Sequence, residues 1–313
     1  MIQLSILLFL LNLAPATGYD FTVAADGSGD FRTVQEAIDA VPPLRRNRTR
    51  IFIKPGTYKE KLILPPTATN VSFIGEDPAT TILSYDDFAS RKNRFGEEIG
   101  TSGSASFFIF GEGFEAFNIT FENSAGPVGQ AVAVRIDGDR VRFFNCRFLG
   151  NQDTLYPHGK ESRQYYKNCY IEGTVDFIFG WSTAVFDSCE IFCKSPGYVT
   201  AASTDQQRTY GFVFRHGGIC SSAPANTVYL GRPWRTYAHT VFLECRLDSL
   251  IRPEGWHNWG KEENEKTARY AEYGNTGPGS DRAGRVTWAR ELSAAEAAGL
   301  TLSAILDGWD PME

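Results

Sequence analysis

One short pattern recurs five times along the chain and limits the folds that the chain can adopt. In each copy a polar residue precedes Ile or Cys, another residue follows, and Phe, Ile or Leu closes the group, as in FNITF (117–121), FNCRF (144–148), KNCYI (167–171), DSCEI (187–191) and LECRL (243–247). Such period-two alternation predicts short strands. The central positions are 119, 146, 169, 189 and 245, so the successive steps are 27, 23, 20 and 56.

One strand type that returns at short, irregular steps, all but the last between 20 and 27, predicts a solenoid of parallel strands in which each coil adds one rung. TRIFIKPG (49–56) and VSFIGE (71–76) fit as earlier rungs. The expected fold class is all-β, a right-handed single-stranded parallel β-helix, with the handedness taken from the general preference of parallel crossovers.

Helical patterns are confined to the two ends of the chain. Residues 33–41 have apolar side chains at helical spacing and stop at Pro42, and residues 293–306 form a second pattern that Gly299 weakens. We expect these short helices to cap the open ends of the coil. No linker divides the chain, so residues 19–313 are expected to form a single β-helix catalytic domain.

The segment 1–18 is apolar from Leu4 to Leu13 and has small residues afterwards. This pattern predicts a signal peptide at 1–18 and a secreted or periplasmic protein. No later segment is long and apolar enough to cross a membrane. The net charge of -6 and the sequence pI near 5.4 argue against nucleic acid or an anionic membrane as partner, but not against a sugar polymer. We expect a monomer.

Six cysteines in an oxidising compartment raise the question of disulfides. Their spacing forms no zinc pattern, and four of them belong to the recurring strand pattern. By elimination, Cys193 and Cys220 are the candidate disulfide pair.

Two aspartates stand in uncharged surroundings, Asp153 in GNQDTLY and Asp176 in GTVDFIFG. Gln130, Asp153 and Asp176 are separated by equal steps of 23, close to the repeat of the coil. Equivalent positions on adjacent parallel coils stack about 5 Å apart, where two carboxylates repel by about 3 kcal/mol at an effective dielectric constant near 20. One carboxyl group should therefore hold a proton while the other is ionised. Such a pair suits acyl transfer or glycoside hydrolysis.

Five ordered motifs resemble the signature set of the pectin methylesterases, or pectinesterases: GTYKE (56–60), QAVAVR (130–135), GNQDTLY (150–156), DFIFG (176–180) and LGRPW (230–234). The resemblance extends from about Tyr19 to Trp309. It implies a right-handed parallel β-helix that hydrolyses methyl esters of polygalacturonate without a metal or an organic cofactor. Tyr58 and Glu60 in the first motif are read as a turn with structural hydrogen bonds.

The resemblance also implies a role for each matched polar residue. Asp176 matches the nucleophile, and Asp153 matches the general acid and base that serves methanol departure and water attack. Gln130 and Gln152 match the amide donors to the oxyanion. Arg232 matches the arginine that keeps the nucleophile ionised through a bidentate contact. Read singly, Asp153 is a strand-end turn residue and Asp176 a structural partner of Arg232.

The same resemblance predicts a sugar-binding groove in which Trp234 forms a wall, beside Tyr156 and Phe179. Trp181 departs from the family pattern and is expected to narrow or extend one subsite. The negative net charge favours highly methylated pectin, unless the groove is locally basic through Arg135, Arg232 and Arg235.

Other functions stay open at this point. A polygalacturonase or pectate lyase needs a different acidic cluster or a calcium site, and none surrounds the two aspartates. A non-catalytic carbohydrate-binding β-helix needs the aromatic groove alone, and a related β-helix esterase would act on a different ester. GWSTA (180–184) resembles part of a serine hydrolase motif, but the four histidines suggest no triad.

Overall fold

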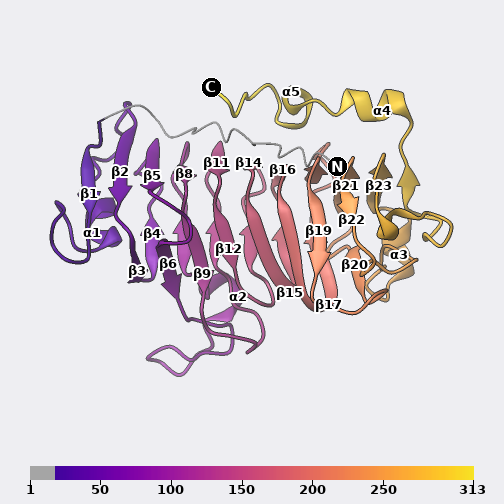
Figure 1. Ribbon diagram of the computed structural model, residues 1–313, viewed down its shortest axis with the longest axis horizontal. Helices are drawn as coiled ribbons and strands as arrows, with labels where there is room; N and C mark the ends of the chain where they lie inside the picture. Colours follow the sequence, from indigo (N-terminus) through magenta and orange to yellow (C-terminus); the bar gives the residue numbers. More distant parts are fainter. Residues whose placement is uncertain (1–17) are drawn as a thin grey trace, which may run out of the picture.

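The computed structural model describes residues 18–313, which form one long coil of parallel strands (Figure 1). The predicted signal peptide therefore lies, apart from Gly18, outside the described residues. One face is a sheet of eleven parallel strands: β1 (Phe21–Val23), β2 (Thr49–Ile53), β5 (Val71–Gly75), β8 (Glu115–Phe117), β11 (Val141–Phe144), β14 (Arg163–Lys167), β16 (Thr183–Asp187), β18 (Phe212–Arg215), β21 (His239–Leu243), β23 (Arg269–Tyr273) and β24 (Arg290–Glu291).

The other thirteen strands form two further faces that two long strands join, β15 (Tyr170–Gly180) and β17 (Glu190–Ala202). On one side of the join lie β3 (Gly56–Lys59), β6 (Thr81–Tyr85), β9 (Thr120–Asn123), β12 (Arg147–Leu149), β19 (Gly218–Ser221) and β22 (Arg246–Leu247). On the other lie β4 (Leu62–Leu64), β7 (Phe107–Ile109), β10 (Val134–Ile136), β13 (Leu155–Pro157) and β20 (Val228–Gly231). The predicted right-handed parallel β-helix is confirmed, with the earlier rungs β2 and β5 in place.

The recurring pattern is a corner between two strands, where the sequence predicted a single strand. In each copy the residue before the central Ile or Cys has a left-handed backbone, with φ of 56°, 52°, 53°, 56° and 51° at Asn118, Asn145, Asn168, Ser188 and Glu244. Asn tolerates this conformation better than most residues. The corner turns the chain, and the central residue of each copy is buried in the core.

The longest step between copies, from position 189 to position 245, hides one complete coil. At His216 the chain makes the same left-handed corner, with φ of 55°, between β18 and β19. Gly217 stands where the other corners place Ile or Cys, and a Cβ there would lie 2.3 Å from the carbonyl oxygen of Cys189. The sequence pattern is not recognised here because this corner has no room for the Ile or Cys side chain that marks the other copies.

Aromatic side chains at equivalent positions of neighbouring strands stack inside the coil. Phe143, Tyr166, Phe186, Phe214 and Phe242 form a continuous ladder with ring centroids 5.1, 4.7, 4.4 and 4.4 Å apart. The ladder runs along the core from β11 to β21 and fixes the register of the faces around it.

The N-terminal helix α1 (Val34–Asp39) caps the first coil as predicted. Thr33 and Glu36 form a capping box at its start, and Val34, Ala37 and Ile38 are buried. Glu60 receives the backbone N–H groups of Val34 and residue 35 at 2.9 and 3.0 Å, so the structural reading of GTYKE is confirmed for this residue.

The C-terminal helical segment forms two helices, α4 (Ala294–Gly299) and α5 (Leu302–Ile305), and these do not cap the last coil. They run back along the outside of the eleven-stranded sheet towards β11 (Figure 1). Ile305 and Leu306 are buried there in a cluster that includes Phe144 and Val213 on the outer face of that sheet. Near the last coil lie the short helices α3 (Glu262–Glu265) and η1 (Pro278–Ser280).

The candidate disulfide is wrong, because the six cysteines are all free. Cys193 pairs in register with Ser221, and Cys220 pairs with Phe192, so the two thiols belong to opposite faces of their strands. Cys193 is buried in the core while Cys220 lies near Glu190 at the surface. In residues 18–313, no helix has the length and apolar character that crossing a membrane requires.

Candidate active site

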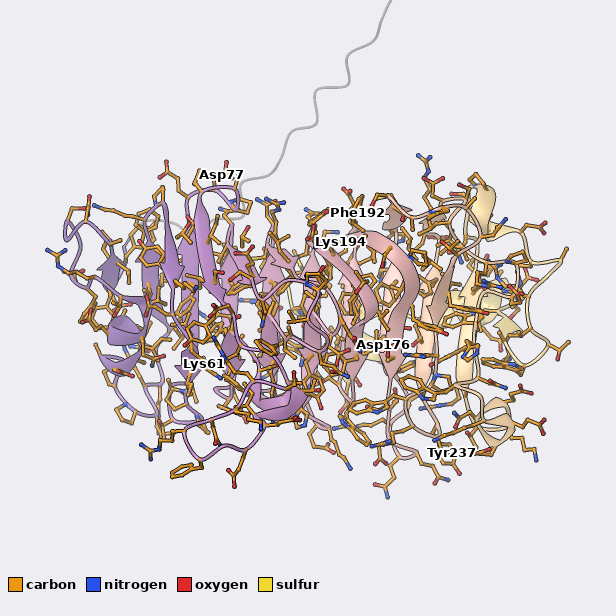
Figure 2. All side chains as sticks on the ribbon, turned by 90° about the horizontal axis from the view of Figure 1, so that it is seen from below. Lys61, Asp77, Asp176, Phe192, Lys194 and Tyr237 are labelled. Carbon is orange, nitrogen blue, oxygen red and sulfur yellow. The ribbon has the colours of Figure 1, made fainter. Side chains whose placement is uncertain are left out.

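The two predicted aspartates lie at equivalent positions of neighbouring coils, and Figure 2 labels Asp176. Leu155 pairs with Ile178, which places equivalent positions of the two motifs at the same level of β13 and β15. Gln130 instead forms a bridge with Gln152, one residue before Asp153. The step of 23 residues read from the sequence is therefore correct for the two aspartates. For Gln130 the step to its partner on the next coil is one residue shorter.

Left-handed backbones turn the two aspartates away from simple strand alternation. Asp153 has φ of 66° and Asp176 of 51°, the same backbone region as the corner residues of the coil. The departure from alternation lets Gln152 and Asp153, although adjacent in sequence, line the same cavity.

Asp176 is held by an arginine, and Asp153 is not. Arg232 donates from Nε and Nη2 to the two carboxylate oxygens of Asp176 at 2.9 and 2.7 Å, the bidentate contact that the sequence predicts. Within residues 18–313 no group donates a hydrogen bond to the carboxyl group of Asp153. Both aspartates are nearly inaccessible, with 8% of Asp153 and 6% of Asp176 exposed.

These surroundings separate the two carboxyl groups electrostatically. Burial raises the pKa of Asp153 well above its ordinary value, the negative charge of Asp176 raises it further, and Arg232 opposes both only in part. Burial also raises the pKa of Asp176, but hydrogen bonds and the charge of Arg232 lower it. Because Arg232 bonds directly to Asp176 alone, Asp153 is the group that retains the proton.

Two aromatic rings fix the plane of the Arg232 guanidinium. Its Cζ lies 3.8 Å from the ring centroid of Tyr198 and 3.8 Å from that of Trp259. Neither ring was predicted: Tyr198 lies within β17 outside the recognised motifs, and Trp259 lies beyond the last motif in a segment without strand pattern. Apart from their aromatic character, the sequence contains no signal for either residue.

A cavity of about 460 Å³ brings together every site residue that the sequence predicted. Its lining contains Gln130, Gln152, Asp153, Asp176, Arg232, Tyr156, Phe179 and Trp234, together with Ala201, Trp259 and residues 100–102. Residues 100–102 belong to α2 (Gly100–Gly103), which was not predicted and stands on a loop that projects from the coil (Figure 1).

The apolar side of the cavity is a stacked aromatic platform. Tyr156 stacks on Phe179 with centroids 4.0 Å apart, and Trp234 lies 6.3 and 5.9 Å from the two rings. Aromatic faces of this kind bind the C–H faces of sugar rings, and the same cavity offers two amides, a protonated acid and an ionised carboxylate. Such a site can bind a sugar and transfer an acyl group from it.

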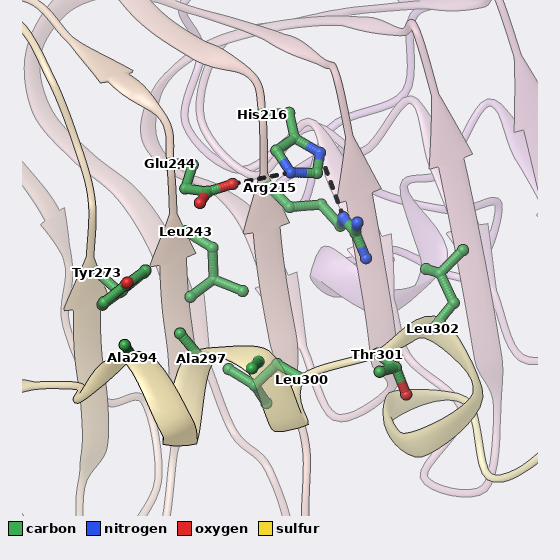
Figure 3. Close-up of a pocket in the computed structure, with 11 residues that line it drawn as sticks. Arg215, His216, Leu243, Glu244, Tyr273, Ala294, Ala297, Leu300, Thr301 and Leu302 are labelled. Carbon is green, nitrogen blue, oxygen red and sulfur yellow. Dashed lines mark hydrogen bonds and ion pairs between the residues drawn. The ribbon is translucent and has the colours of Figure 1, made fainter.

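A larger cavity, of about 540 Å³, lies on the outer face of the eleven-stranded sheet, under α4 (Figure 3). It is bordered by Leu243, Leu300 and Leu302, and His216 contacts Glu244 at 3.1 Å there. Its lining, within the described part of the chain, contains no paired carboxyl groups and no amide side chain. Groups of three or more potential metal ligands are absent from residues 18–313.

Comparison with known proteins gives a consistent result. A protein-family model described as Pectinesterase matches residues 20–308. Pectinesterase 31 of Arabidopsis thaliana is 46% identical over 281 residues, which cover 88% of each chain. The chain spans about half the length of other curated relatives, for example 50% of Pectinesterase 4 of the same plant.

Solved structures resemble the whole coil. A pectin methylesterase from carrot superimposes with a TM-score of 0.85 at 37% identity, covering 94% of this chain and 95% of that one. A pectin methylesterase in complex with a hexasaccharide has a TM-score of 0.82 at 29% identity, covering 95% and 99%.

Proposed function

This chain belongs to the pectinesterase family of carboxylic ester hydrolases, and we propose that it removes methyl esters from the galacturonate units of pectin and releases methanol. The observation that carries the proposal is the unequal pair of buried carboxyl groups, of which only Asp176 is bonded to Arg232. A related structure holds a hexasaccharide, which supports a polysaccharide substrate. The signal-peptide pattern of residues 1–18 supports a protein that acts outside the cytoplasm, either secreted or periplasmic.

In the first half of the reaction, a carboxylate oxygen of Asp176 attacks the C6 carbonyl carbon of a methylated galacturonate. Gln130 and Gln152 donate hydrogen bonds to the oxyanion that forms, and each well-aimed donor contributes about 3 to 4 kcal/mol. The C–O bond to methanol then breaks, and the departing oxygen takes the proton of Asp153. An acyl-enzyme with an anhydride bond to Asp176 remains.

In the second half, Asp153 is ionised and removes a proton from water. The water oxygen attacks the C6 carbonyl carbon, and the bond to Asp176 breaks. The products are the galacturonate carboxylic acid, which ionises, and the two aspartates in their starting states. No step of this cycle requires a metal or an organic cofactor.

The test is methanol release from methylated pectin by the unmodified protein and by the Asp153→Ala and Asp176→Ala variants. We expect methanol without new reducing ends, and a fall in turnover of at least about 100-fold in both variants. New reducing ends or unsaturated sugar ends would instead indicate polymer cleavage. A carbohydrate-binding β-helix would be supported by two results together. The unmodified protein would release no methanol, and the Asp176→Asn variant would bind pectin as tightly as the unmodified protein does.

A further inference from the structure

One side chain contacts both ends of the loop that forms a wall of the cavity. This loop, residues 86–106 between β6 and β7, carries α2 and is called the α2 loop below (Figure 1). Asn123 is the last residue of β9, and only 3% of it is exposed. Because a buried amide needs hydrogen-bond partners, its contacts show which parts of the chain it holds in place.

The amide of Asn123 bonds backbone groups of three segments. Its Nδ2 donates to the carbonyl oxygens of Asp87 and Val132 at 2.8 and 2.9 Å, and makes a longer contact of 3.4 Å with that of Ser104. Its Oδ1 accepts the backbone N–H of Ala125 at 3.0 Å. The amide therefore joins both ends of the α2 loop to the segment that precedes β10.

That segment carries Gln130. The backbone N–H of Ala89, two residues after Asp87, donates to the carbonyl oxygen of Gln130 at 2.8 Å, and Gln130 forms a bridge with Gln152 on the next coil. The side chain of Gln130 is exposed in the cavity and makes no hydrogen bond within residues 18–313. Its direction therefore depends on the position of its own backbone.

Further contacts connect the two ends of the α2 loop. Lys61, which Figure 2 labels, donates from Nζ to the carboxylate of Asp87 and to the carbonyl oxygen of Gly103, the latter at 2.8 Å. The hydroxyl oxygen of Ser104 accepts the backbone N–H of Val132 at 3.2 Å. The start of the loop, the end of the loop and the segment before β10 are thus bonded to one another, with Asn123 in contact with all three.

We propose that Asn123 is a positioning residue for Gln130, and so for one of the two amide donors to the oxyanion. This inference rests on the proposed function. The Asn123 amide holds Asp87 and Val132, and through them the backbone that contacts Gln130 and the backbone that follows it. A donor stabilises the oxyanion only when its N–H points at the developing charge, and a misplacement of about 1 Å can cost about 100-fold in rate.

A double-mutant cycle separates this role from a purely structural one. A residue that only stabilises the fold changes turnover independently of Gln130, so its effect adds to that of Gln130→Ala. A residue that acts through Gln130 has no further effect once Gln130 has been removed.

The first arm measures kcat for methanol release in Asn123→Ala, Gln130→Ala and the double variant. Asn123→Ala should lower kcat by about 10- to 100-fold in the unmodified background. In the Gln130→Ala background it should lower kcat by less than about threefold. Equal losses in the two backgrounds would overturn the proposal.

Gln164→Ala is the matched control. Gln164 is also a buried amide, whose Nε2 donates to the hydroxyl oxygens of Ser162 and Ser182 at 2.9 and 3.1 Å, but it does not line the cavity. We expect it to lower the urea midpoint without lowering kcat. A fall in kcat in Gln164→Ala as large as that in Asn123→Ala would show that loss of any buried amide has this effect, and would overturn the proposal.

A milder variant keeps the test decisive if Asn123→Ala does not fold. Ser104→Ala removes the hydroxyl contact with Val132 and leaves the Asn123 amide in place. It should lower kcat by about two- to fivefold in the unmodified background and not at all in Gln130→Ala. An equal fall in both backgrounds would count against the proposal in the same way.

The last arm is independent of catalysis. Hydrogen exchange at the backbone amides of Ala89 and Val132, followed by NMR, should become about tenfold faster in Asn123→Ala and stay unchanged in Gln164→Ala. Unchanged exchange at both amides in Asn123→Ala would overturn the proposal. Absence of methanol release by the unmodified protein would instead refute the proposed function, and the exchange rates would still decide whether Asn123 fixes the backbone around Gln130.

Discussion

Removal of Arg232 tests the electrostatic asymmetry on which the mechanism rests. Arg232→Leu leaves the carboxylate of Asp176 nearly buried and without its two hydrogen bonds. Loss of one partner of a buried ion pair costs about 3 kcal/mol at the lower end of measured values, and the lower end applies because 18% of the Arg232 side chain is exposed. The protein escapes part of this cost when Asp176 takes up a proton, and the nucleophile is then neutral.

At about 1.4 kcal/mol per factor of ten, this loss predicts a fall in kcat/KM of about 100-fold at neutral pH. Among residues 18–313, Arg232 supplies the only influences that lower the pKa of Asp176, so the acidic limb of the pH–rate profile should move to higher pH in the variant. The folded-state pKa of Asp176 then lies further above its unfolded value, so the variant should lose stability as pH rises through that range. Methanol release and urea unfolding, each measured from acidic to mildly alkaline pH, report both effects.

Two further variants complete the comparison. Arg232→Lys retains the charge but not the planar fork or the fit between the rings of Tyr198 and Trp259, so it should lose about tenfold. Arg163→Leu removes a comparable bidentate pair, with Asp139, away from the cavity and should lower stability without the change in pH profile. An Arg232→Leu variant with kcat/KM within about threefold of the unmodified value, or with an unmoved acidic limb, would refute the argument.

Two other predictions concern stability. Burial raises the pKa of Asp153, so the unmodified protein should lose stability as pH rises from the ordinary carboxyl range through that raised value; Asp153→Asn should abolish that loss in urea titrations, and an unchanged pH dependence would contradict the assigned protonation. Gly217→Ala should destabilise by about 1 to 3 kcal/mol, because its Cβ would lie 2.3 Å from the carbonyl oxygen of Cys189. Gly218→Ala, whose Cβ meets nothing closer than 3.7 Å, is the control, and equal unfolding midpoints for the two variants would show that the corner has room.

The repeat was readable in the sequence because the central residue of each corner points into the core, where size and polarity are restricted. The sequence did not show that each copy of the pattern is a corner. A short run of alternating polarity is the same in one continuous strand and in two strands joined by a residue with a left-handed backbone. The coil at His216 escaped notice since Gly217 has no side chain to mark it. The sequence of the C-terminal helices looks like that of helices that cap a coil. They pack instead on the apolar outer face of the eleven-stranded sheet, which includes Val213, and the sequence does not show that this face is apolar.

The site followed from spacing where the coils are regular and from resemblance elsewhere. The separation of Asp153 and Asp176 equals one coil, so their proximity could be predicted. Gln130 belongs to a coil one residue shorter, which no local signal reveals. Trp259 comes from a segment without repeat, so its contact with Arg232 depends on the folding of the last coil and was invisible before the structure.

The C-terminal segment makes the stability of the middle coils depend on residues that are synthesised long after those coils. Arg142 donates to the backbone oxygens of Pro311 and Glu313, and Arg163 donates to that of Leu306. During synthesis the coils can form one after another. The apolar outer face of the eleven-stranded sheet stays exposed to solvent until the C-terminal segment has been made and packs on it. Because this segment is bonded to β11 and β14 near the middle of the coil, it opposes local unfolding that starts at the last coil. We therefore expect the coils to unfold in one cooperative transition and not one after another.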